Sequence, residues 1–292
     1  MRLRNLSALF SSALFAFTVT GFASQSHWEK AMQEEKTSYQ RCQLDKAEKF
    51  LKAAAKETLY FAFDDPHLVE TLNAGGDLFR AEGQFRRAEF AYDQALIFGA
   101  AWLQPDSPVL ARSLVGLGIV SQETHQNDFE RAESFFNEAL KIQSISLAPD
   151  NLQVATTLNC LGELNLLRHR NGIAESLFQR ALAIRRKNLN PDDPALAQML
   201  EDLGLVCAHE GKLNQAASSF EEALTIYRES LGPNRCELAV ALRNYASLLT
   251  QMGRAAEAKE LEAESLAIAL QHLPKGPIAL PFYHPRLVRH RN

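Results

Sequence analysis

A period of 42 residues constrains the fold of this chain more than any other feature. Segments that start with aspartate or asparagine recur at separations of 42, 44, 42 and 42 residues, beginning at Asp64, Asp106, Asp150, Asp192 and Asn234. The two extra residues of the second interval fall in the turn 124–129, because Ala132 and Ala174 are again 42 residues apart. A fixed period of this length indicates an array of repeats that bury their apolar surfaces against one another.

Each repeat has the pattern of two helices joined by a turn. In the repeat 192–233, Asp193 suits a helix N-cap and Pro194 suits the first helical position. An apolar stripe at spacings of three and four residues follows, and Gly211 interrupts it. A second stripe of the same period includes Phe220. Neither helix can bury its stripe alone, so the sequence predicts helix pairs that stack on one another.

The repeats share columns of large and small residues. The first helices carry the leucines Leu72, Leu114, Leu158, Leu200 and Leu242. The second helices carry the alanines Ala88, Ala132, Ala174, Ala216 and Ala258. Four residues after the alanine comes an aromatic residue, at Tyr92, Phe136, Phe178 and Phe220, whereas the last repeat has Glu262. Small residues let two helices cross closely, and a large residue one turn away fills the adjoining space.

These columns divide the chain into eight segments. They are a signal peptide at 1–23, a degenerate repeat at 24–63, five repeats at 64–105, 106–149, 150–191, 192–233 and 234–273, and a proline-rich basic tail at 274–292. The prediction is an all-α solenoid of about six helix pairs. Trp28, on the first stripe, is interpreted as a core residue at the end of the array. The tail is either a disordered terminus or an extended segment that lies on the solenoid.

The N-terminus has the three-part pattern of a secretory signal peptide. Arg2 and Arg4 precede an uncharged apolar stretch at 6–22, and Gly21 and Ala23 are small residues before a cleavage site. We expect export to the periplasm or beyond the cell, with no membrane insertion after cleavage. The alternative is an uncleaved anchor, since the apolar stretch is near the shortest length that spans a bilayer.

Nothing in the sequence predicts catalysis or a cofactor. The histidines have no metal-ligand spacing, and Gly75 and Gly76 lie inside a helical pattern rather than in a phosphate loop. We therefore expect no enzyme activity, no cofactor and no metal. The net charge of −4 argues against nucleic acid as a partner. The four cysteines lack a close pairing, and stacked repeats would hold Cys160 and Cys207 too far apart for a disulfide, so thiols are expected.

The repeats resemble the tetratricopeptide repeat (TPR), in the 42-residue form of kinesin light chain-like arrays of the bacterial type. The resemblance rests on the segments 157–162 (TLNCLG) and 174–185 (AESLFQRALAIR), and on Asp192-Asp193-Pro194 with Leu231-Gly232-Pro233. It covers about Trp28 to Leu273. It implies a right-handed superhelix in which first helices line the concave face, and a groove there that holds a peptide or protein partner.

Kinesin light chain repeats often have paired asparagines after the leucine of the first helix, and these can bind an extended peptide backbone. Here the resemblance places Asn73, Asn159 and Asn244 at such positions, whereas Glu201 and Asp202 replace the pair in one repeat. This departure argues against a ligand shared with motor light chains. It predicts that a bound peptide carries a basic residue at this acidic pair.

Helical spacing on the first helices gives the candidate partner-binding residues. They are Asn73, Asp77, Arg80, Arg112, Asn159, Glu163, Gln198, Glu201, Asp202, Arg243 and Asn244. The predicted function is a non-enzymatic scaffold that binds an unidentified peptide or protein. The alternative is a structural or assembly component of the cell envelope without a ligand in the groove.

Overall fold

The computed structural model describes residues 24–39, 43–62, 64–124, 129–231 and 236–271. Their regular structure is entirely helical, with twelve α-helices and no strand among the described residues. This confirms the predicted all-α class. The predicted signal peptide 1–23 and tail 274–292 lie outside the described residues. None of the described helices is long and apolar enough to cross a membrane.

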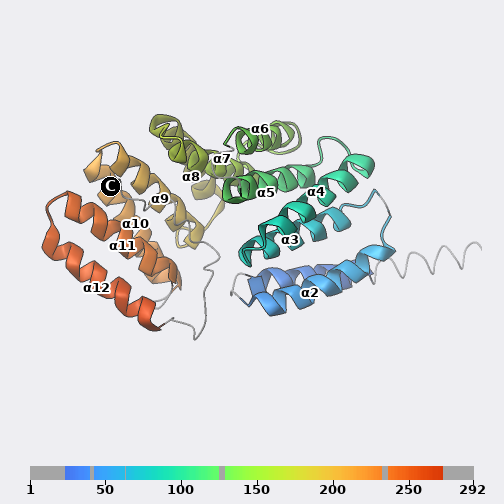
Figure 1. Cartoon of the computed structure of the whole chain (residues 1–292), viewed down its shortest axis with the longest axis horizontal. Coiled ribbons are helices and arrows are strands. Elements are labelled where there is room, and N and C mark those ends of the chain that lie inside the picture. Colours follow the sequence, from blue (N-terminus) through green and yellow to red (C-terminus); the bar gives the residue numbers. More distant parts are fainter. Residues whose placement is uncertain (1–23, 40–42, 63, 125–128, 232–235, 272–292) are drawn as a thin grey trace, which may run out of the picture. The chain divides into compact units, whose positions relative to one another are not determined.

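The chain forms two compact units (Figure 1), and the division falls between α5 and α6. Unit 1 contains the N-terminal helix 24–39, α2 (Leu44–Glu57), the short 3-10 helix η1 (Thr58–Tyr60), α3 (His67–Ala81), α4 (Phe85–Trp102) and α5 (Pro108–Thr124). Unit 2 contains α6 (Phe129–Ser146), α7 (Leu152–Leu167), α8 (Asn171–Asn188), α9 (Pro194–His209), α10 (Leu213–Leu231), α11 (Cys236–Gln251) and α12 (Ala255–Gln271). The sequence places its two extra residues at this same division.

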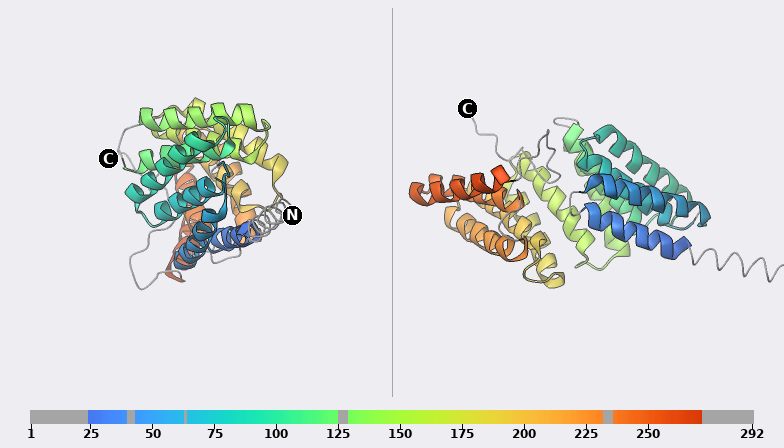
Figure 2. Two further views of the ribbon diagram at one scale, coloured as in Figure 1. Left: turned by 90° about the vertical axis from the view of Figure 1, so that its right-hand side faces the viewer. Right: turned by 90° about the horizontal axis from the view of Figure 1, so that it is seen from below.

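Within each unit, helices that are consecutive in the chain pack against each other. In unit 1, α3 packs on α4, and α5 contacts both of them. In unit 2, α7 packs on α8, α9 on α10 and α11 on α12, and successive pairs are joined through α8 with α9 and α10 with α11. The views in Figure 2 show the same pairing of neighbouring helices inside each unit. This arrangement is the predicted stack of helix pairs.

The local signals in the repeat 192–233 act as the sequence predicts. The Oδ1 atom of Asp193 accepts a hydrogen bond of 2.8 Å from the backbone N–H of Ala195, and Pro194 begins α9. Gly211 has a φ of +76°, which is the left-handed conformation that glycine tolerates best. The chain therefore starts α9 with a side-chain cap and leaves it through a glycine turn.

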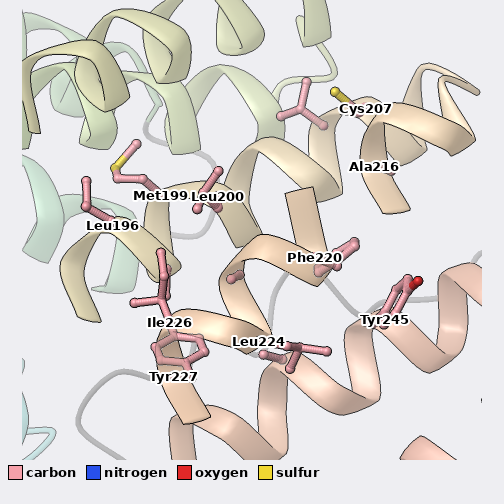
Figure 3. Close-up of a cluster of buried hydrophobic side chains, with 14 of the residues drawn as sticks. Leu196, Met199, Leu200, Cys207, Ala216, Phe220, Leu224, Ile226, Tyr227 and Tyr245 are labelled. Carbon is pink, nitrogen blue, oxygen red and sulfur yellow. The ribbon is translucent and has the colours of Figure 1, made fainter. Parts of the chain in front are cut away.

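The small columns bring the paired helices into close contact. The alanines and aromatic residues of the second helices are fully buried, and Figure 3 shows Ala216 and Phe220 beside α9. The rings of Tyr92, Phe178 and Phe220 lie where first-helix glycines leave room. A Cβ atom added to Gly162 would lie 2.5 Å from Cε1 of Phe178, and one added to Gly204 would lie 3.0 Å from Cε2 of Phe220. Close packing against these rings therefore accounts for the glycines without a phosphate ligand.

These two equivalent glycines give a matched prediction. Alanine favours a helix over glycine by about 1 kcal/mol, whereas overpacking a core costs about 1–3 kcal/mol. Gly162→Ala should lower the free energy of unfolding by about 1–2 kcal/mol, because its Cβ atom would overlap the ring of Phe178. Gly204→Ala should change it by less than about 1 kcal/mol, since Phe220 is farther away. Urea unfolding of both variants tests this, and equal losses would contradict it.

One detail of the predicted core differs from the expectation. Leu72 is only half-buried, unlike the other four leucines of its column. Where α3 meets α2, the buried cluster contains Ala74 and Leu78 instead. Cys160 and Cys207 are buried thiols, as predicted. The side chains of Cys42 and Cys236 lie outside the described part of the chain.

Candidate functional site

The first helices of unit 2 carry a group of polar residues that we call the unit 2 polar face. Its members are Asn159, Glu163, Gln198, Glu201, Asp202, Arg243 and Asn244. They come from α7, α9 and α11, and α9 contacts both of the other helices. The column leucine of each of these helices is buried in the core. The residues that directly follow it in sequence lie on another side of the helix, away from the buried stripe.

Glu201 connects α9 to α11. The Nδ2 atom of Asn244 donates a hydrogen bond of 2.5 Å to Oε1 of Glu201. Glu201 is only 8% exposed. Burial raises its pKa to about 7, although the amide of Asn244 and the charge of Arg243 act in the opposite direction. Two of the predicted binding residues thus make a contact between successive repeats.

Asp202 is oriented toward the preceding repeat. Burial raises the pKa of its carboxyl, the carboxylates of Glu163 and Glu201 raise it further, and the guanidinium of Arg185 on α8 opposes them. Arg185 also donates from Nη1 to the backbone oxygen of Ala195 at 3.2 Å. Neighbouring carboxylates in a desolvated place favour a protonated form or an added cation. The acidic pair is therefore split, with one carboxylate near each adjoining repeat.

The polar face contains acceptor atoms that the described residues leave unused. Asn159 is 8% exposed, and its Nδ2 atom donates to Oε1 of Glu163 at 2.7 Å. Its Oδ1 atom and the Oδ2 atom of Asp202 are buried without a hydrogen-bond donor among the described residues. Such buried acceptors are uncommon in folded proteins and indicate that a donor from water or a ligand completes them. Gln198 and Arg243 are exposed on the same helices.

Candidate residues of unit 1 make contacts within unit 1. Asn73 is buried and uses both ends of its amide, since Nδ2 donates to the Val109 oxygen at 3.2 Å and Oδ1 accepts from Ser113 Oγ at 2.7 Å. Asp77 accepts hydrogen bonds from the hydroxyl of Tyr92 at 2.6 Å and from Nη2 of Arg112 at 2.7 Å. These contacts join α3 to α4 and α5.

Two guanidinium groups of unit 1 stabilise the ionised form of Asp77. Burial alone would raise the pKa of Asp77, but Arg112, Arg80 and the hydroxyl of Tyr92 outweigh it and hold the pKa below its ordinary value. Arg80 is close enough to contribute, and its Nε atom is buried without an acceptor among the described residues. Asp77, Arg80 and Arg112 thus form one charged cluster with Tyr92.

Sequence reasoning missed Glu35 and the cavity that it lines in unit 1. Glu35 is 6% exposed and lies on the same side of the helix 24–39 as Trp28, Met32 and Tyr39. The signal was a single glutamate three residues after Met32 and four before Tyr39, on an otherwise apolar stripe. A charged residue at such a position is rarely buried without a partner.

Comparisons with known proteins agree with this stack of helix pairs. A tetratricopeptide repeat family model matches residues 153–229 and 197–271. BtubC (BKLC) from P. vanneervenii has a similar structure, with a TM-score of 0.60 and 20% identity over 88% of this chain and 95% of that one. A Podosopora anserina structure of kinesin light chain nearly identical TPR-like repeats gives a TM-score of 0.58 and 18% identity, over 71% and 97% of the two chains. At these identities the likeness concerns the fold. A search of the curated proteins finds no match.

Proposed function

Because this chain is a tetratricopeptide repeat protein with kinesin light chain-like repeats, we propose that it is a non-catalytic scaffold that binds a basic segment of another polypeptide on the unit 2 polar face. Repeat proteins of this kind generally bind proteins or peptides and have no catalytic centre. The proposal commits to one surface, formed by α7, α9 and α11, and to one chemical property of the partner, a lysine or arginine side chain.

The observation that carries the proposal is the pair of unused buried acceptors. Oδ1 of Asn159 and Oδ2 of Asp202 accept no hydrogen bond from the described residues. An extended polypeptide has backbone N–H groups, and a basic side chain has charged N–H donors. Either can complete acceptors that would otherwise cost free energy in the folded protein.

The preference for a basic partner comes from the charge of this surface. Glu163 and Glu201 both raise the pKa of Asp202, so the three carboxylates influence one another, and Arg185 is the cation that opposes them at Asp202. An additional cation near Glu201 and Asp202 would stabilise their ionised forms. Hydrogen bonds between charged groups are about twice as strong as neutral ones, which favours lysine or arginine over a neutral residue.

Selection of random peptides displayed on phage tests the proposal without a known partner. The chain from Ser24 to Asn292 should select peptides that share lysine or arginine at one position. The double variant Glu201→Gln with Asp202→Asn should lose this preference, because it keeps the side-chain shapes and removes both charges. For one selected peptide, fluorescence polarisation should show binding at least about tenfold weaker with this variant.

The matched control neutralises two exposed acids on second helices, Glu229→Gln with Glu260→Gln. It changes the net charge by the same amount and should select the same peptides as the unmodified chain. Selection of peptides without a basic position would contradict the proposal. So would a basic preference that the Glu201 and Asp202 variant retains.

A further inference from the structure

Unit 1 contains a cavity of about 670 Å³ between the helix 24–39 and α3, with Arg112 of α5 at its edge. This volume lies within the range of small-ligand sites in proteins, roughly 300–1,000 Å³. The cavity is formed by unit 1 alone and is separate from the unit 2 polar face. Binding at this cavity is therefore independent of the proposed function.

One wall of the cavity is aromatic and apolar. Trp28, Met32, Tyr39 and Ala74 line it. The indole N–H of Trp28 donates to Oγ1 of Thr71 at 2.9 Å, and its ring meets the ring of His67 edge-on, with centroids 4.1 Å apart. These two contacts fix the orientation of the indole. A fixed aromatic wall suits the apolar stem of a ligand and attracts a cation held over its face.

The polar part of the cavity is acidic. Four carboxylates line it, those of Glu29, Glu35, Glu70 and Asp77, against the two cations Lys36 and Arg112. Arg112 is already bound to Asp77, and the second oxygen of Asp77 accepts from Tyr92. The charge of Arg112, on α5, is therefore paired with Asp77. Lys36 is exposed on the helix that carries Glu35.

Glu35 and Glu70 differ from Asp77 in that no cation of the described residues is bound to them. Neither carboxylate has a hydrogen-bond or ion-pair partner within the part of the chain that the structure describes. Burial raises the pKa of Glu35 to about 7, with Asp77 adding to the effect and Arg112 and Lys36 opposing it. Burial likewise raises the pKa of Glu70. A buried carboxylate without a partner is costly unless something neutralises it.

We propose that this cavity binds an organic cation with a short apolar stem, with Glu35 as the group that receives the charge and Trp28 and Tyr39 as the wall for the stem. The alkylammonium group of a lysine side chain has this chemistry, and so does a free alkylamine. Glu35, 6% exposed and without a partner in the described chain, lies at the cavity that the ligand would fill. Glu70 supplies a second carboxylate from α3.

Calorimetric titration of the chain 24–292 tests this inference. The cationic probes are n-butylammonium and Nα-acetyl-lysine N-methylamide, and the neutral control is Nα-acetyl-norleucine N-methylamide. The cations should bind and the neutral analogue should not. Binding should be about tenfold tighter at pH 8 than at pH 6, because a carboxyl with a pKa near 7 must lose its proton to hold a cation. The other ionisable groups at the cavity are those of Glu29, Lys36, Tyr39, Glu70, Asp77 and Arg112.

Glu35→Gln should weaken the binding of both cations by at least about tenfold and reduce the pH dependence to the part that Glu70 contributes. Glu34→Gln is the matched control, since Glu34 is the exposed neighbour on the same helix. It should bind as the unmodified chain does. At pH 8, Glu35→Gln should also melt at the same temperature or higher, because it removes a buried charge, so a loss of binding cannot be ascribed to unfolding.

The two probes also distinguish the sources of the cation. Tighter binding of the blocked lysine supports the site and identifies a polypeptide side chain as its ligand. Tighter binding of n-butylammonium supports the site and identifies a free amine. Binding of the neutral analogue as strong as that of the cations would overturn the inference. So would unchanged cation binding by Glu35→Gln, or no cation binding at pH 8.

Discussion

Phe178→Ala is expected to lower the free energy of unfolding by about 3–5 kcal/mol. Phe178 is fully buried in the main core of unit 2, and its ring fills the space over Gly162. The neighbouring column residues, Ala174 and Ala181, are small and fully buried. Because glycine and alanine cannot reorient to refill the space, the site should collapse little and most of the cavity should remain.

The two units can be followed separately in this experiment. Trp28 and Trp102 are the two tryptophans of the chain, and both belong to unit 1. Circular dichroism reports the loss of helix in both units, whereas tryptophan fluorescence reports the unfolding of unit 1. In Phe178→Ala, the part of the circular dichroism transition that belongs to unit 2 should move to lower urea concentration, and the fluorescence transition should stay in place. Arg180→Ala, at an exposed position of the same helix, is the control and should change the stability by less than about 0.5 kcal/mol. A loss below about 1 kcal/mol for Phe178→Ala would contradict the packing of its ring against Gly162.

Glu201→Gln is expected to stabilise unit 2 at pH 8 by up to about 3 kcal/mol and to have little effect near pH 4. The carboxyl of Glu201 holds its proton to about pH 7 in the folded chain, against an ordinary pKa of 4.5. Between these values the folded state binds a proton that the unfolded state has released. Raising the pH through this window therefore lowers the stability of the unmodified protein. Glutamine cannot ionise, and its Oε1 atom can still accept from Asn244.

Urea unfolding followed by circular dichroism at about pH 5 and pH 8 measures this effect. The difference between variant and unmodified protein should grow with pH. Buried carboxyls that do not interact with Glu201 remain in both proteins, so their contributions cancel in the difference. Asp202 adds to the effect in the same direction, because its pKa is lowered when the charge of Glu201 is removed. Glu229→Gln, at an exposed position on α10, should give the same difference at both pH values. A Glu201→Gln effect that is independent of pH would contradict the buried, protonated state of this carboxyl.

The helix pairs could be predicted from the sequence because their signals are local. Asp193, Pro194 and Gly211 act on the backbone next to them, so their roles depend only on their own positions. The alanine and aromatic columns repeat, so each copy supports the others. Helical spacing also placed the candidate residues on the first helices. It did not identify the partner of each side chain, since that depends on the next helix.

Asn73 and Asn159 illustrate this limit. Both directly follow the column leucine of their repeat. Asn73 accepts from the hydroxyl of Ser113, which precedes the leucine of the next repeat. The equivalent residue after Asn159 is Met199, which has no donor, and Oδ1 of Asn159 has no partner in the described chain. An asparagine at the same repeat position thus joins two helices in one repeat and leaves its acceptor unused in another.

Glu35 could not be assigned from the sequence for a similar reason. Its position on an apolar stripe indicates burial, yet the cavity depends on how the helix 24–39 meets α3 and on Arg112 being held by Asp77. The last of these is a contact between residues 35 positions apart. The comparison of the repeats does not reveal this contact, because the other repeats have different residues at the positions of Asp77 and Arg112.

The pairing of a first-helix glycine with a second-helix aromatic ring limits how this array can be rearranged. Gly162 and Gly204 accompany Phe178 and Phe220, whereas the last repeat has Ala246 at the glycine position and Glu262 at the aromatic one. Changing one partner alone leaves either a steric overlap or a void. In these two repeats a helix pair is therefore the smallest interchangeable piece, and recombination within the gene should preserve folding best when its breakpoints fall between pairs. In unit 1 the ring of Tyr92 lies over Gly116 of the next pair as well as over Gly76 of its own, so a breakpoint between those pairs should also disturb the packing.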